Sequence, residues 1–152
     1  MDILWLVGVS VSKKNFGKFK EKIIEIAKKF DISNLTPILY IDDIIQIDEL
    51  NRKMVEELKL LEPFGEANET PIFAFKDLKI DSIRGLSDGK HLKLSLKSNK
   101  NTFINAIGFN LGEYLNEFKI GDKVDIAGNL EINSYNGVDS IQINIKDIMK
   151  SI

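Results

Sequence analysis

The chain has 152 residues, 43% of them hydrophobic and 29% charged, which is the composition of a globular protein and not of a disordered one. It contains no cysteine, which excludes disulfide bonds and thiolate metal sites and suits a reducing compartment, so we expect a cytoplasmic protein. The formal net charge of −2 excludes the global basic excess that nucleic-acid-binding proteins often carry.

The first part of the chain predicts a small α/β segment. Residues 3–11 form a mostly apolar run, which predicts a buried strand because the run is too short to span a bilayer and its lysines follow it. Asn15 is expected to cap a helix with one apolar face. The apolar side chains of that helix are Phe16, Phe19, Ile23, Ile26 and Phe30. Residues 35–47, LTPILYIDDIIQI, predict one or two strands for this face to cover.

A second helix is predicted to follow. Asp48 is the expected N-cap, because its short carboxylate can accept from the free N–H groups of the first helical turn. The apolar stripe of this helix comprises Leu50, Met54, Leu58 and Leu61. Pro63 ends the helix, since proline disfavours helical backbone in the residue before it. The next residues, PFGEAN, predict a turn in which we interpret Glu66 and Asn68 as structural residues.

After this turn the hydrophobic period changes from 3.6 to 2, which predicts strands. The five expected strands lie in TPIFAFKDLKI, HLKLSLK, TFINAIGFN, KVDIAGNLEIN and DSIQINIKDI. The segments GLSDG and SYNG predict hairpin turns, with Gly85 and Gly89 able to adopt positive φ. The helix-like segment LGEYLNEF lies between the third and fourth strands. That order predicts a five-stranded antiparallel OB-fold β-barrel, with an SH3-like barrel as the alternative.

The predicted fold class is therefore α+β, in three parts. We expect a small α/β segment over residues 1–47, a connecting helix and turn over 48–68, and the OB-fold domain over 69–152.

The sequence contains no catalytic constellation. A single histidine, His91, excludes a His-x-x-x-His metal site and a Ser-His-Asp triad. Asp42 and Asp43 are adjacent, which in a strand directs them to opposite faces, so we interpret them as turn or surface acids. A glycine-rich phosphate loop of the Lys-Ser/Thr type is also absent from the sequence. We expect no catalytic residue, no metal site and no cofactor in this chain.

Charge is distributed unevenly along the chain. Residues 1–30 carry seven Lys against three acids, and residues 31–80 carry five basic and eleven acidic side chains. From Arg84 to Lys100, five basic residues stand against Asp88 alone. A local basic stripe of this kind can bind phosphates, although a solvated strand face has the same composition.

A binding surface is predicted on the second strand. In HLKLSLK the leucines alternate with polar side chains, which places the polar ones on the face where nucleic acid lies on an OB barrel. The candidate nucleic-acid-binding residues are Arg84, Lys90, His91, Lys93 and Lys97, with Phe109, Tyr135 and Asn136. The basic groups would contact phosphates, and the rings, including Phe103, would stack on bases. Phe109 is either exposed or part of the core, and His91 either flanks the basic face or is a packing residue.

Four blocks of the sequence resemble the C-terminal region of RecJ-type single-stranded-DNA exonucleases, in the same order and at similar spacings. These blocks are LEPFGEANETPIF, GKHLKLSL, NAIGFNLGE and GDKVDIAGNLEINSYNGVDSIQINIKDI. The segment VGVSVSKKNFGKFKEKIIEIAKKF, residues 7–30, resembles the later part of the DHHA1 domain that precedes the OB domain in this family. The resemblance implies a 5′→3′ exonuclease of DNA repair and recombination, which uses Mn²⁺ or Mg²⁺ bound in an N-terminal DHH domain.

The chain departs from this family in its catalytic motifs. It has no Asp-His-His and no Gly-Gly-His before Val7, so no catalytic residue can be transferred to it. We therefore expect a C-terminal part of such an enzyme, inactive alone, that binds single-stranded DNA and has the missing DHH catalytic domain as its partner. The alternatives are an architectural or protein-interaction OB module and an OB domain tied to RNA. An uncovered apolar face around Trp5, Phe16 and Phe19 also predicts self-association.

Overall fold

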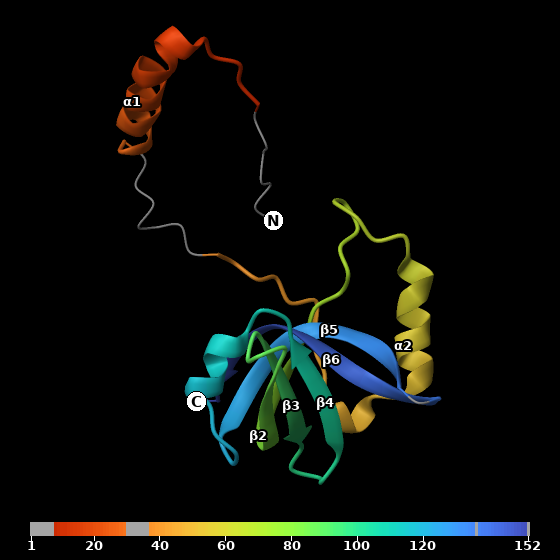
Figure 1. The fold of residues 1–152 in the computed structure, drawn as a ribbon. Coiled ribbons are helices and arrows are strands. Elements are labelled where there is room, and N and C mark those ends of the chain that lie inside the picture. Colours follow the sequence, from red (N-terminus) through yellow and green to blue (C-terminus); the bar gives the residue numbers. More distant parts are fainter. Residues whose placement is uncertain (1–7, 30–36, 136, 152) are drawn as a thin grey trace. The chain divides into compact units, whose positions relative to one another are not determined.

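The structure, a computed structural model, describes residues 8–29, 37–135 and 137–151. The chain forms two compact units, with the boundary between Leu39 and Tyr40. Among the described residues, the first unit contains helix α1 (Phe16–Ala27), and the second contains the β-sheet and helix α2 (Figure 1).

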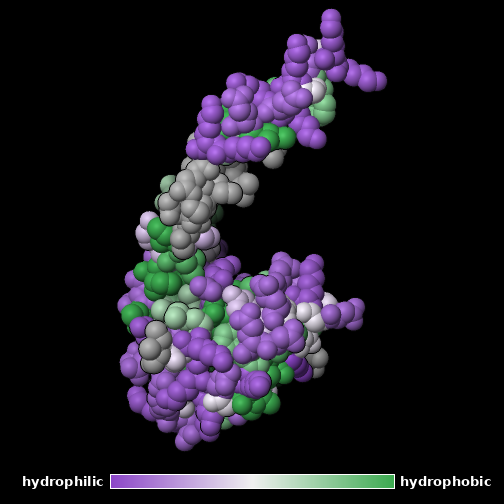
Figure 2. Space-filling view, turned by 90° about the vertical axis from the view of Figure 1, so that its left-hand side faces the viewer, coloured by the Kyte–Doolittle hydropathy of each residue, from purple (hydrophilic) through white to green (hydrophobic). Residues whose placement is uncertain are grey.

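Helix α1 begins directly after Asn15, as predicted, although the Asn15 side chain forms no capping hydrogen bond. The apolar side chains of α1 remain accessible in this unit: Phe16 is 59% exposed, Ile23 49% and Ile26 45%. In Figure 2 the surface of the unit is mostly hydrophilic, with hydrophobic residues along one side. The helix is therefore amphipathic, as its sequence period indicates.

The strands predicted for the first part of the chain are largely wrong where the structure describes them. Residues 1–7 lie outside the described residues, and residues 8–11 form no strand. Within the described part of residues 35–47, the only strand is the two-residue β1 (Asp43–Ile44). It is short because Ile45 turns into the barrel core and a 3-10 turn follows.

Five longer strands form the barrel that the alternating pattern predicts. They are β2 (Phe73–Leu86), β3 (His91–Lys97), β4 (Phe103–Gly108), β5 (Lys123–Tyr135) and β6 (Val138–Lys150). The sheet order is β1-β2-β3-β4-β6-β5, and β5 pairs back onto β2, which closes the barrel. The β4–β6 and β1–β2 pairs are parallel, and the other pairs are antiparallel. The short 3-10 helix η5 (Gly112–Asn116) lies between β4 and β5, so the predicted OB fold is confirmed.

The barrel core follows from the period-2 pattern of its strands. Leu92, Leu94 and Leu96 on β3 are at most 1% exposed, whereas the residues between them are only partly buried. Fully burying a leucine stabilises the fold by about 1.5–3 kcal/mol. Because a shift of one residue would turn these leucines outward, their burial fixes the register of β3 and directs its polar side chains to the outer face.

Helix α2 (Arg52–Leu58) starts later than predicted. Asn51, and not Asp48, is its N-cap, and the Asn51 side chain accepts a hydrogen bond from the Met54 N–H at 3.0 Å. Asp48 lies instead in the 3-10 turn Ile47–Glu49, and extended backbone at Leu50 separates that turn from the helix. Asp48 is unavailable as a cap because two side chains of the β3–β4 turn bind its carboxylate.

The turn that follows α2 is held by one asparagine. The Asn68 side chain donates to the backbone oxygens of Leu61, at 2.7 Å, and Pro63, at 3.1 Å. Its backbone also pairs with that of Gly65. These contacts agree with the structural role predicted for the turn, because they engage both the side chain and the backbone of Asn68.

The β2–β3 turn differs from the prediction in its glycines. Positive φ occurs at Ser87, Asp88 and Gly89, whereas Gly85 is an ordinary strand residue of β2. Gly112 of η5 packs against this turn so closely that a Cβ there would lie 1.7 Å from the Gly89 carbonyl oxygen. The Gly112 N–H donates to the Lys90 carbonyl at 3.1 Å, so η5 supports the turn that carries Lys90.

Asp48 joins the segment before α2 to the β3–β4 turn. Its carboxylate accepts from the Ser98 hydroxyl at 2.9 Å and from the Thr102 hydroxyl. The Thr102 hydrogen bond, followed by the Ser98 hydrogen bond and the charge of Lys100, holds the pKa of Asp48 below its ordinary value, against the effect of partial burial. The ionised carboxylate is therefore the form that the fold favours.

We expect Asp48→Asn to lower the free energy of unfolding at neutral pH and to have little effect in strong acid. A carboxylate whose folded pKa is depressed stabilises the fold above its unfolded pKa, near 3.8, and loses this contribution as the pH falls through the folded value. Urea unfolding at several pH values, with the exposed Asp81→Asn as a control, measures the difference. A deficit in the Asp48 variant that is equal at every pH would contradict this account.

Candidate functional site

Two pairs of like charges face each other on the outer surface of β2 and β3. The register places Arg84 opposite Lys93 and Lys79 opposite Lys97. Within the described residues, none of these four cations has a carboxylate oxygen within 4.0 Å. Like charges directly opposite each other in a sheet are destabilising, by roughly 0.2–1 kcal/mol per pair. The surface is thus a row of cations that an external anion would stabilise.

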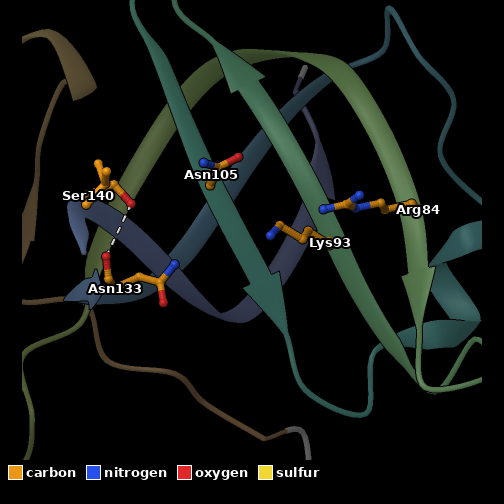
Figure 3. Close-up of a pocket in the computed structure, with 6 residues that line it drawn as sticks. Arg84, Lys93, Asn105, Asn133 and Ser140 are labelled. Atoms are coloured by element: carbon orange, nitrogen blue, oxygen red, sulfur yellow. Dashed lines mark hydrogen bonds between the residues drawn. The ribbon is translucent and has the colours of Figure 1, made fainter. Parts of the chain in front are cut away.

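A hollow of about 420 Å³ lies over one of these pairs, Arg84 and Lys93. Its lining residues are Arg84, Lys93, Asn105, Asn133, Val138 and Ser140. Figure 3 shows Arg84, Lys93 and Asn105 on three neighbouring strands, β2, β3 and β4, with Asn133 and Ser140 on the β5–β6 hairpin. The hollow therefore has one wall from the barrel face and another from the hairpin.

The hairpin wall exists because β5 and β6 outrun their neighbours. Pairing between β2 and β5 ends at Gly128, and pairing between β4 and β6 begins at Gln142. The β5–β6 ladder, however, continues to Tyr135 and Val138. We call the described part of this extension, residues 129–135 and 137–141, the arm. Opposite Asn133 lies Ser140, so both residues lie on the arm face that lines the hollow.

The other face of the arm contacts α2. Asp139 accepts from Arg52 of α2 at 2.7 Å and also from the Ser134 hydroxyl (Figure 1 shows α2 beside this end of the hairpin). The Ser134 hydrogen bond and then the Arg52 hydrogen bond lower the pKa of Asp139. Hydrogen bonds to Glu56 and then to Asp139 raise the pKa of Arg52. The arm is therefore held on its side away from the hollow.

Aromatic rings lie at both ends of β4. Phe103 at its start is 54% exposed, and Lys97 Nζ lies 5.2 Å from the centre of its ring. Phe109, just after its end, is 51% exposed and packs edge-on against His91, with ring centres 5.4 Å apart. His91 is half-buried, and its Nδ1 accepts from the Asn110 N–H at 3.0 Å. Both rings are accessible for stacking, so Phe109 is a surface residue, and His91 packs at the flank of the basic face.

The structure brings together part of the predicted set. Arg84 and Lys93 line the hollow, Lys97 lies at one end of β3, and Lys90 is exposed on the β2–β3 turn. The Tyr135 backbone is paired in the arm, but the position of its side chain and all of Asn136 lie outside the described part of the chain.

The sequence reasoning missed the residues that complete the hollow. Asn105 alternates with buried Ile104 and Ala106 on β4, a signal that could have placed it on the outer face. Asn133 and Ser140 also alternate with apolar residues, but their position at the hollow depends on how far the hairpin outruns the barrel, which no local pattern indicates.

The acids predicted to be surface residues have backbone partners. The Asp42 carboxylate accepts from the Ile72 N–H, and that of Asp43 accepts from the Ile44 N–H, each at 2.8 Å. Among residues 8–29, 37–135 and 137–151, no cluster of three or more His, Cys, Asp or Glu side chains could hold a metal ion. In the same residues no helix is both long and apolar enough to cross a membrane.

The chain is similar to bacterial RecJ proteins over nearly its whole length. It is 23% identical over 142 residues to the single-stranded-DNA-specific exonuclease RecJ of Bacillus subtilis, covering 92% of this chain and 18% of the relative. It is 26% identical over 144 residues to the single-stranded-DNA-specific exonuclease RecJ of Thermus thermophilus, covering 94% of this chain and 20% of that relative. The chain thus spans about a fifth of the length of these relatives.

A solved structure and a family model agree with these relatives. The crystal structure of RecJ in complex with Mn²⁺ from Thermus thermophilus matches with a TM-score of 0.71 and 25% identity, over 95% of this chain and 20% of that one. The model of the RecJ OB domain matches residues 41–147, which include strands β2 to β5 and most of β6. The chain therefore belongs to the RecJ OB domain family.

Proposed function

We propose that this chain is the single-stranded-DNA-binding OB module of a RecJ-type enzyme. The observation that carries the proposal is the presence of two like-charge pairs across β2 and β3, Arg84 opposite Lys93 and Lys79 opposite Lys97. The first of these pairs lines the hollow bounded by the arm. A fold that keeps such pairs without neutralising acids gains stability when phosphates bind there. The name of the relatives, single-stranded-DNA-specific exonuclease, supports the same ligand.

In this proposal the cations of β2 and β3 follow the phosphates of a single strand. Binding then releases counterions and weakens as the salt concentration rises. Phe103 and Phe109 offer exposed rings on which bases stack, a contact worth about 1–3 kcal/mol per base and tolerant of sequence. His91 positions one of these rings, and Lys90 extends the basic surface at the β2–β3 turn.

We further propose that the module serves a 5′→3′ exonuclease of DNA repair and recombination in the cytoplasm. Its Mn²⁺ or Mg²⁺ would be held by a DHH domain that this sequence does not contain, while residues 1–47 would form part of a DHHA1 domain. The part played by this chain is to bind the single strand and orient it toward that domain. A channel wide enough for one strand would then reject duplex DNA.

A second candidate function is an architectural or protein-interaction module of the same enzyme. It is favoured by the acidic stretch over residues 31–80, where eleven acids stand against five basic residues and would repel DNA. In that case DNA binding by the isolated chain would be weak and insensitive to changes on β3.

Changing Lys93 and Lys97 to Glu separates these two functions. We expect affinity for a labelled single-stranded oligonucleotide to fall at least about tenfold at low salt and the dependence on salt to become shallower, because phosphate contacts are lost. We also expect thermal stability to stay equal or rise, since each Glu now faces a cation across the sheet.

Fluorescence anisotropy at two salt concentrations, with a duplex control, and thermal unfolding provide both readouts. The matched control is Lys119→Glu with Lys146→Glu, which makes the same charge change at two exposed positions outside β3. Unchanged single-strand affinity in the β3 double variant would favour the architectural function.

Replacing Phe103 and Phe109 by Ala tests the stacking contacts. Each change should weaken single-strand binding by about 1–3 kcal/mol and leave the salt dependence unchanged, because a lost ring removes no charge. Ile120→Ala, which removes an exposed apolar side chain outside the site, is the control for anisotropy titrations. An equal loss in the control, or a change in the salt slope alone, would contradict a stacking role.

The predicted self-association stays a proposal, carried by α1. Phe16 and Ile23 are about half exposed and share the apolar face of this helix, whereas Trp5 lies outside the described residues. We expect sedimentation velocity to show a concentration-dependent increase in mass that Phe16→Glu with Ile23→Glu abolishes. A monomer at the highest attainable concentration would overturn it without affecting DNA binding.

A further inference from the structure

The chemistry of the hollow differs between its β2–β3 side, the first wall, and the side formed by β4 and the arm, the second wall. Arg84 and Lys93 provide full positive charges from β2 and β3, whereas Asn105, Asn133 and Ser140 provide amides and a hydroxyl from β4 and the arm (Figure 3). A phosphate gains most from the first wall, because charge-assisted hydrogen bonds are about twice as strong as neutral ones. The second wall offers donors and acceptors together, which a phosphate, an acceptor only, cannot use fully.

The carboxylate of Glu131 increases this difference in charge between the two walls. Glu131 precedes Asn133 by two residues on β5 and so lies on the same face of the arm. Its Oε1 accepts from the Gln142 side chain at 2.8 Å, and Gln142 is only 7% exposed. The Gln142 amide is neutral, so this pair adds no positive charge to the arm side. A carboxylate on this face of the arm disfavours a phosphate there, whereas the cations of the opposite wall attract it.

A single strand bound in the hollow would therefore lie with its backbone over β2 and β3 and its bases toward β4 and the arm. Asn105 is exposed and Asn133 half-buried, so both amides are accessible to a base. An asparagine amide presents one acceptor and two donors. The Watson–Crick edge of each base carries a donor beside an acceptor, so an amide matches the edge of any base that is unpaired.

Building on the proposed function, we propose that Asn105 and Asn133 bind the Watson–Crick edge of a nucleobase while Arg84 and Lys93 bind its backbone. The hollow is then a subsite for an unpaired base, separate from the stacking rings of Phe103 and Phe109. Duplex DNA cannot use this subsite, because pairing already occupies the same edges. The arm thus contributes to single-strand selectivity through hydrogen bonds as well as through shape.

The test compares two labelled oligonucleotides of about 12 thymidines, a length within the range that one OB fold covers. One carries ordinary thymine and the other N3-methylthymine, which keeps the stacking face and the phosphates but blocks the donor of the Watson–Crick edge. The full chain, the variant with Asn105→Ala and Asn133→Ala, and the control Asn116→Ala on η5 are titrated by anisotropy. Thermal unfolding confirms that each variant is folded.

We expect methylation to weaken binding to the wild-type chain and to Asn116→Ala by about fivefold or more, and to leave the double variant unaffected. The double variant should also keep the wild-type salt slope, because it retains both cations. Equal binding of the two oligonucleotides by the wild-type chain would overturn the edge-binding subsite and leave the proposed single-strand binding intact. No binding of either oligonucleotide at low salt would overturn both proposals.

Discussion

The closure of the barrel depends on one strand, β2, which pairs with β3 along its second half and with β5 along its first half. The change of partner coincides with Asp77, a non-glycine residue at a φ of 55° that interrupts the β2–β5 register. Three contacts hold this conformation. The Asp77 N–H donates to the Asp125 carboxylate at 2.9 Å, while Lys123 and Asn99 donate to the Asp77 carboxylate at 2.7 and 2.9 Å. The Lys123 hydrogen bond, and then that of Asn99, lowers the pKa of Asp77, so the bend is stabilised by an ionised group.

This bend also explains why the site has an arm. Since β2 leaves β5 beyond Gly128, the last part of β5 has only β6 as a partner, and an isolated two-stranded ribbon is marginally stable in water. Helix α2 contacts β5 and supplies support to the arm through the Arg52–Asp139 ion pair. An exposed ion pair alone contributes little, and α2 is itself anchored by Val55, which is 2% exposed in the hydrophobic core. The arm side of the hollow therefore depends on a helix that lies outside the barrel strands.

Periodicity was enough to predict the barrel, because each leucine of β3 and each buried residue of β4 repeats at a spacing of two. The same alternation placed Lys93 and Lys97 correctly on the outer face. The predicted N-cap of α2 was wrong because Asp48 and Asn51 are both residues that cap helices well. The long-range contacts of Asp48 with Ser98 and Thr102 decide between them. Asn133 was missed for a related reason, since no local pattern reveals where a hairpin outruns its sheet. Long-range contacts, and not local preference, therefore determine both the start of α2 and the position of Asn133.

The charges of β2 and β3 show how stability and binding oppose each other in this fold. A Glu at Lys93 would face Arg84 and remove a repulsion, so selection for stability alone has no reason to keep two cations there. Natural proteins hold such locally unfavourable arrangements at sites where a ligand relieves them. Arg84 and Lys93 are also flanked by amides and not by acids within the hollow, so an anion meets no competitor among its lining residues. In the proposed site, the repulsion in the free protein would become part of the binding free energy, because a bound phosphate would interact with both cations at once.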